Sequence, residues 1–128
     1  MPPPDAGGVS SAVVTVRGQS DAKHGNQPSY AVVYLNELAS ESYSDQNRPK
    51  FRIGSIIVRE KLPEPDAKQP ELLTVMIKRE PGFNPKGGDW LFLTLAGDGS
   101  RVTERTKTGA CLECHQSARN DDFVFRIR

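Results

Sequence analysis

Two cysteines and a histidine near the end of the chain constrain this sequence more than any other feature. The 128 residues contain only two cysteines, Cys111 and Cys114, and His115 directly follows the second. The C-x-x-C-H spacing is the signature of covalent attachment of a c-type haem. Two thiols about one helical turn apart can each add to a porphyrin vinyl group, and the adjacent imidazole then lies under the iron. The motif predicts one covalently attached haem c per chain, with His115 as the metal ligand.

The same cysteine pair also fits three other uses. These are a redox-active pair, half of a zinc site completed by His24 and a carboxylate, and two buried thiols. A thioredoxin-like pair normally follows a strand near the start of a βαβ fold, whereas this pair lies close to the end of the chain. Two cysteines are too few for a disulfide-rich scaffold or a four-cysteine zinc site. The haem interpretation is therefore favoured.

Charge and hydropathy exclude several classes of partner. Seventeen Lys and Arg residues against sixteen Asp and Glu residues give a net charge of +1, so nucleic acid is not a predicted partner. No apolar run approaches the ~20 residues that a membrane-spanning helix needs, and the chain begins without the pattern of an export signal. Because a c-type haem is attached outside the cytoplasm, we expect a periplasmic or otherwise extracytoplasmic protein whose natural precursor carries such a signal.

Runs of β-branched and aromatic residues predict a sheet. We expect strands over Tyr30–Leu35, Ser55–Leu62, Leu72–Lys78 and Trp90–Leu95, and either a first strand or an extended arm over Val9–Arg17. The connections are mostly too short for parallel crossovers, so the sheet should be antiparallel. Asn36 is a suitable N-cap for a short helix that reaches Tyr43. The expected fold class is α+β, mainly β, with a few short helices.

The ends of the chain differ from this pattern. Residues 1–8 are rich in Pro and Gly and should form a flexible tail, which leaves a single haem-binding domain over residues 9–128. From Thr108 the pattern becomes helical around the cysteine pair, and Asp122–Ile127 looks extended. The charged stretch Lys78–Glu80 is most simply a solvated turn.

The motifs in combination resemble the cytochrome P-460 family. The stretches that carry the resemblance are Gly54–Leu62, Thr74–Phe83, Gly87–Trp90, Cys111–His115 and Asp122–Phe125, with His24-Gly25 and Val33–Asn36 before them. They span about four fifths of the chain. The resemblance implies a mostly antiparallel β fold with a few helices, a single c-type haem and a homodimer.

The family has two functional branches, and one position distinguishes them. In the enzymes, which oxidise hydroxylamine, a lysine is cross-linked to the porphyrin. The cytochrome c-prime-beta branch lacks that bond and binds nitric oxide or carbon monoxide at a five-coordinate iron. The resemblance aligns the cross-linking lysine with Arg59, whose guanidinium stays protonated and is not expected to form the bond.

The resemblance and the strand alternation together suggest a distal pocket. In a regular strand Arg59 shares a face with Ser55, Ile57 and Lys61 and would face the haem. Candidate lining residues are Arg59, Ile57, Phe51 and Tyr30, with Phe83 as a further aromatic wall. By default Met76, Trp90 and Phe92 are core, and His24 is a loop residue.

We therefore predict a mono-haem cytochrome with five-coordinate iron that binds nitric oxide or another diatomic gas. One alternative is an enzyme that oxidises hydroxylamine, which would need Lys61 or Lys78 to reach the ring. Another is an electron carrier for a redox partner cytochrome, which would favour Met76 as a second axial ligand.

Overall fold

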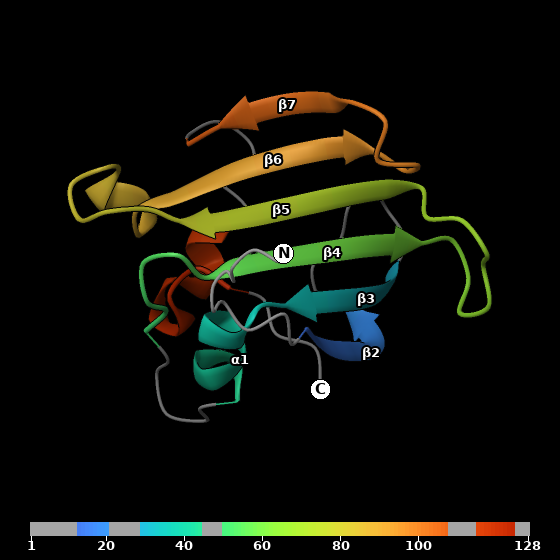
Figure 1. Cartoon of the computed structure of the whole chain (residues 1–128), viewed down its shortest axis with the longest axis horizontal. Helices are drawn as coiled ribbons and strands as arrows, with labels where there is room; N and C mark the ends of the chain where they lie inside the picture. Colours follow the sequence, from blue (N-terminus) through green and yellow to red (C-terminus); the bar gives the residue numbers. More distant parts are fainter. Residues whose placement is uncertain (1–12, 21–28, 45–49, 108–114, 125–128) are drawn as a thin grey trace, which may run out of the picture.

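The computed structural model describes residues 13–20, 29–44, 50–107 and 115–124. Within these ranges, six strands form one antiparallel sheet in the order β2-β3-β4-β5-β6-β7, which is also their order along the chain (Figure 1). One α-helix and two short 3-10 helices accompany the sheet. The predicted fold class, a mainly β antiparallel fold with a few short helices, is therefore confirmed.

Most of the predicted strands are confirmed to within one residue. The observed strands are β2 (Val14–Ser20), β3 (Ser29–Leu35), β4 (Ile56–Leu62), β5 (Leu72–Lys78), β6 (Trp90–Ala96) and β7 (Val102–Thr106). Strand β2 spans Val14–Ser20, and it runs past the predicted end at Arg17 because backbone pairing with β3 continues to Ser20. The predicted start at Val9 lies outside the described residues. Strand β7 was not expected, since its polar sequence lies exposed at a sheet edge, where pairing with β6 needs no apolar face.

The predicted helix and its cap are confirmed. Helix α1 spans Glu37–Tyr43, and the Asn36 side-chain oxygen accepts a hydrogen bond from the backbone N–H of Ala39 at 3.0 Å. The Asn36 amide also donates to the carbonyl of Gly54 at 2.8 Å, which fixes α1 to the start of β4. Among the described residues, no helix combines the length and apolar character required to cross a membrane.

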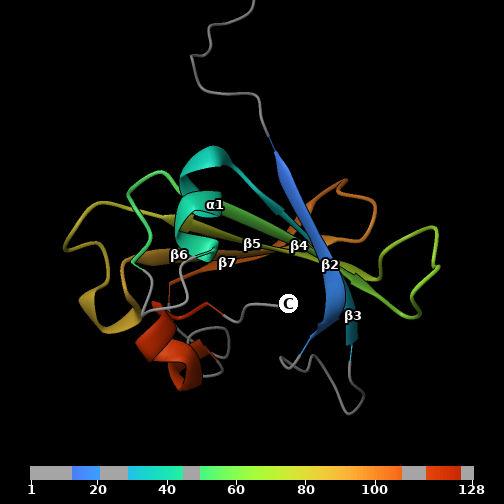
Figure 2. The same cartoon turned by 90° about the horizontal axis from the view of Figure 1, so that it is seen from below.

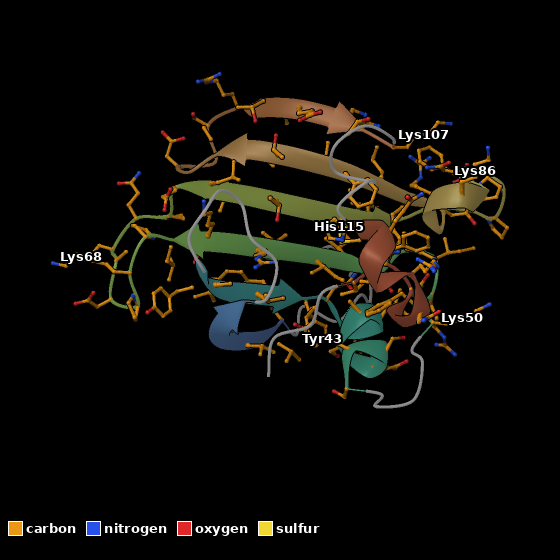
Figure 3. The ribbon with its side chains drawn as sticks, turned by 180° about the vertical axis from the view of Figure 1, so that it is seen from behind. Tyr43, Lys50, Lys68, Lys86, Lys107 and His115 are labelled. Atoms are coloured by element: carbon orange, nitrogen blue, oxygen red, sulfur yellow. The ribbon has the colours of Figure 1, made fainter. Side chains whose placement is uncertain are left out.

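One face of the sheet forms the core. Strand pairing aligns Ile57, Met76 and Phe92 across β4, β5 and β6 on this face. The buried cluster comprises Ala31, Val33, Leu35, Ala39, Tyr43, Phe51, Ile57, Met76, Trp90, Phe92 and Val124. The 3-10 helix η2 (Gln116–Asp121) lies against this side of the sheet (Figures 2 and 3), and α1 contributes Ala39 and Tyr43 to the cluster. We call this side the core face.

The segment after η2 is a correction to the sequence prediction. Asp122 and Phe123 adopt positive φ angles of 56° and 68°, so the chain turns sharply instead of extending from Asp122. Their backbone N–H groups donate to the carbonyls of Arg119 and Ala118, which closes the turn at the end of η2. Residues 125–128 lie outside the described residues.

Candidate haem site

His115 stands at the N-cap of η2, where this helix lies over the sheet (Figure 3). Its ring packs against Phe92 of β6, with 5.2 Å between ring centroids and 41° between ring planes. Since Phe92 belongs to the core face, the imidazole lies on that face. The structure therefore brings the predicted metal ligand next to the core of the sheet.

The two ring nitrogens of His115 have different roles. Nδ1 lies 2.6 Å from the backbone carbonyl oxygen of Phe123. A carbonyl can only accept a hydrogen bond, so Nδ1 carries the proton and the lone pair of the neutral imidazole resides on Nε2. Metal-binding histidines usually donate their second ring N–H in this way, which fixes the tautomer and raises ligand basicity. The arrangement suits binding of a metal through Nε2.

Electrostatics keep this imidazole neutral. Burial lowers the pKa of His115 below its ordinary value, and the positive charge of Arg59 lowers it further. The hydrogen bond to the Phe123 carbonyl raises the pKa; its effect is smaller than that of burial and larger than that of the Arg59 charge. A neutral imidazole is the form that coordinates iron.

Arg59 and Ile57 lie on the core face of β4, as the strand alternation predicted. Ile57 is 6% exposed and Arg59 only 7%. Arg59 stands between Val33 of β3 and Thr74 of β5 in the strand register. Arginine is seldom buried unless its charge has a function or a partner. The structure thus brings Arg59 and Ile57 to the same face as His115.

Phe51 and Tyr30 occupy different surroundings. Phe51 is buried, packs edge-on against Trp90 at 5.6 Å, and donates its backbone N–H to the Asp122 carboxylate. Tyr30 pairs with Leu62, one residue beyond Lys61, so it points to the side of the sheet opposite Arg59. Phe51 belongs to the support beneath η2, and Tyr30 does not share a face with the other candidate residues.

Three sequence predictions fall on residues outside the described ranges. Cys111, Cys114 and His24 lie in these parts of the chain. By contrast, Met76 is described and buried, between Ile57 and Phe92 in the register. Its predicted role in the core is confirmed.

Lys78 and Asp122 form a pair that the sequence prediction missed. Lys78 was expected in a solvated turn, yet its ammonium binds both carboxylate oxygens of Asp122, at 3.0 and 2.8 Å. Both side chains are nearly buried, at 13% and 11% exposure. A signal was present in the sequence, because Lys78 continues the alternation that places Thr74 and Met76 on the core face. The correction applies to Lys78 alone, since Arg79 and Glu80 form an exposed pair.

The described residues fit a bound haem on the core face. His115 offers a neutral nitrogen ligand, and Ile57 and Phe92 supply apolar contacts for a porphyrin. Arg59 supplies a buried guanidinium whose N–H groups can donate to a propionate carboxylate. An axial ligand, apolar contacts and a counter-charge are the elements that haem binding requires.

Comparison with known proteins agrees with this geometry. The family model for cytochrome P460 matches residues 10–126. No curated protein matches the chain. With nearly the whole sequence matched, the chain belongs to the cytochrome P460 family, which implies a c-type haem protein.

Proposed function

We propose that this protein binds nitric oxide or another neutral diatomic gas at a single haem held through Cys111, Cys114 and His115. The observation that carries the proposal is the His115 imidazole. Its Nδ1 is committed to a backbone carbonyl, and it lies on the same buried face as Arg59. A haem iron with one protein ligand and one open axial position binds such gases.

The protein's own residues favour small uncharged ligands. Ile57, Met76 and Phe92 form an apolar row on the core face, and a hydrated anion would lose more solvation there than a neutral diatomic molecule. Arg59 supplies N–H donors that can bind a propionate, a water molecule or the polar end of a ligand. The described core face thus combines an apolar surface with the buried guanidinium of Arg59.

Arg59 also supports gas binding over hydroxylamine oxidation. By resemblance it stands where the enzymes of the family carry the lysine that cross-links to the porphyrin. A guanidinium stays protonated at any physiological pH and is a poor nucleophile. We therefore expect no bond from a side chain to a porphyrin meso carbon and slow or absent hydroxylamine turnover.

The absorption spectrum of the ferrous protein, with and without nitric oxide, tests this proposal. We expect a high-spin spectrum that changes on adding nitric oxide, and haem that stays with the protein through acid-acetone extraction. A low-spin spectrum with two protein ligands, or complete release of the haem, would contradict it. Robust hydroxylamine oxidation, or a bond from Lys61 or Lys78 to the ring, would assign the protein to the enzyme branch.

Substitution of Arg59 tests the role of the buried cation. Arg59→Leu should alter gas affinity without releasing the haem, since the cysteines and His115 remain. Arg105→Leu is the matched control, because Arg105 is an exposed strand arginine on β7. Equal gas affinities in the two variants would exclude Arg59 from the ligand site.

We also propose a homodimer that forms outside the cytoplasm. The face opposite the core carries a row of half-buried apolar side chains, Val58, Val75 and Leu93, aligned across three strands. Pairing of two such faces would remove this apolar surface from water. Light scattering at tens of micromolar protein measures the assembly state, and a monomer would count against the proposal.

A further inference from the structure

The turn that follows η2 holds an unfavourable backbone conformation. Asp122 and Phe123 both have positive φ, and neither is glycine. Each such residue costs about 1 kcal/mol, so the pair persists only where surrounding contacts hold it. This turn orients the Phe123 carbonyl that accepts from His115 Nδ1 at 2.6 Å. Whatever holds the turn therefore positions the imidazole.

Three anchors hold Asp122: two come from strands of the sheet and one from the segment that precedes β4. The Lys78 ammonium at the end of β5 binds both carboxylate oxygens. The backbone N–H of Phe51, ahead of β4, donates to the same carboxylate at 2.8 Å. Trp90, at the start of β6, donates its indole N–H to the Asp122 carbonyl at 2.7 Å. The turn is thus fastened to the sheet at both the side chain and the backbone of one residue.

Lys78 is the anchor that carries charge. Its ammonium lies 5.0 Å from the centre of the Trp90 ring, so a cation–π contact aligns it toward Asp122. Charge-assisted hydrogen bonds in a site shielded from water are roughly twice as strong as neutral ones. The Trp90 anchor joins two neutral groups, and the Phe51 anchor has a neutral donor. Only Lys78 supplies a positive charge, so its loss would leave the Asp122 carboxylate buried without its counter-charge.

We propose that Lys78 is a positioning residue for the iron ligand, acting through Asp122 and the Phe123 carbonyl on His115. Lys78 stabilises the Asp122–Phe123 turn, and this turn orients the Phe123 carbonyl. The carbonyl keeps the proton of His115 on Nδ1 and so raises the donor strength of Nε2. The inference rests on the proposed function in one respect, that His115 is the axial ligand. The effect is indirect, because it passes from the Lys78–Asp122 pair through the turn to the Phe123 carbonyl and then to the imidazole.

The experiment compares three variants of the haem-loaded protein. Lys78→Met removes the charge and keeps an unbranched side chain against Trp90, while Lys78→Arg keeps the charge and the donors. Arg79→Met is the matched control, since it removes one positive charge at the next residue, from an exposed pair with Glu80. The readouts are the iron–histidine stretching band in resonance Raman spectra of the ferrous protein and the reduction potential. Urea unfolding of each variant measures stability separately.

We expect Lys78→Met to shift the iron–histidine band to lower wavenumber and to raise the reduction potential, because a weaker hydrogen bond at Nδ1 makes Nε2 a weaker donor. Lys78→Arg should restore both values, and Arg79→Met should match the unsubstituted protein. A Lys78→Met protein that is less stable but has an unchanged band and potential would overturn the proposal, since the pair would then be structural only.

If Lys78→Met does not fold, the variant Asp122→Asn tests the same proposal from the other partner of the ion pair. Asp122→Asn preserves size and tolerates a positive φ, and it should shift the band in the same direction. Failure of the proposed function has a different signature. If His115 is not the axial ligand, the iron–histidine band of the unsubstituted protein would be absent or would survive in His115→Gly. Both the proposed function and the role of Lys78 would then be contradicted.

Discussion

The two ends of the sheet use the same kind of ion pair in different ways. At the end where β5 stops and β6 starts, which we call the η2 end, Lys78 Nζ lies 2.8 Å from Asp122 Oδ2 and both side chains are nearly buried. At the opposite end, the hairpin end, Lys61 Nζ lies 3.9 Å from Glu71 Oε2. The Glu71 side chain is 46% exposed. Figure 1 shows these ends at the left and right of the sheet.

The difference shows that burial, more than residue type, decides what an ion pair does. Exposed pairs are screened by water and contribute little. A buried pair keeps its strength, and removal of one partner leaves a costly isolated charge. At the η2 end the pair fixes a strained turn next to His115, whereas at the hairpin end it only flanks a connection between two strands. The η2 end should therefore be the sensitive one in every measurement.

The largest effect is expected when the imidazole itself is removed from the η2 end. His115→Gly should leave the haem attached through Cys111 and Cys114, while the native absorption spectrum and gas affinity are lost. Added imidazole should restore part of the spectrum, because it can occupy the vacated position. Absorption spectra with and without imidazole provide the measurement. An unaltered spectrum in the variant would identify another residue as the axial ligand.

The next largest effect is a loss of folding stability on replacing glycine, and it should differ between two glycines with similar φ angles. Gly88 at the η2 end and Gly99 at the hairpin end have φ of 70° and 75°. A Cβ on Gly88 would lie 2.7 Å from Phe123 Cδ1, whereas on Gly99 its nearest neighbour is Leu73 Cδ1 at 3.7 Å. Gly88→Ala should cost about 3 kcal/mol from backbone strain plus the clash, and Gly99→Ala about 1 kcal/mol from strain alone.

Urea unfolding measures both free energies, and the haem spectrum gives an independent readout. Only Gly88→Ala should disturb the spectrum, since Phe123 also carries the carbonyl that binds His115. Equal costs for the two substitutions would show that Phe123 moves aside freely and that the turn is less rigid than its contacts suggest.

A smaller change in the free energy of unfolding is expected when the Lys61–Glu71 ion pair at the hairpin end is removed. Glu71→Gln should change the free energy of unfolding by about 0.5 kcal/mol or less, because the pair is long and its carboxylate is well exposed. The comparison with Asp122→Asn is direct, since both changes neutralise one carboxylate. If urea unfolding gave equal losses for the two variants, burial would not be the deciding difference.

The smallest effect concerns Asp98 in the turn between β6 and β7. Hydrogen bonds from the Ser100 hydroxyl and backbone N–H lower the pKa of the Asp98 carboxyl below its ordinary value of 3.8. The folded state therefore gains stability above pH 3.8 from this group, and that gain disappears as the pH falls through the lower folded value. An NMR titration of the carboxyl carbon should show the lowered midpoint, and Ser100→Ala should return it toward 3.8.

The sheet could be predicted from the sequence because its signals are local. Alternating apolar residues and the Asn36 cap locate β3 to β6 and α1, and the same alternation places Ile57 and Arg59 on one face. Strand β7 escaped prediction because Val102–Thr106 carries no apolar alternation and is held by pairing with β6.

The support beneath His115 could not be predicted because it depends on contacts between distant residues. Nothing near Lys78 in the sequence indicates Asp122 as its partner, 44 positions away. The positive φ of Asp122 and Phe123 also has no local signal, since neither is glycine and both read as part of an extended segment. The haem motif predicts His115 as the ligand, and the tertiary structure determines which residues hold its imidazole.

The three anchors of Asp122 also bear on the order of folding. They join it to Lys78, Phe51 and Trp90, at sequence separations of 44, 71 and 32 residues. Each described strand, by contrast, pairs with its neighbours along the chain, and such short loop closures form early because they lose little chain entropy. We therefore expect the antiparallel sheet to form first. The segment that carries His115 then docks late, when Lys78, Phe51 and Trp90 already lie close together.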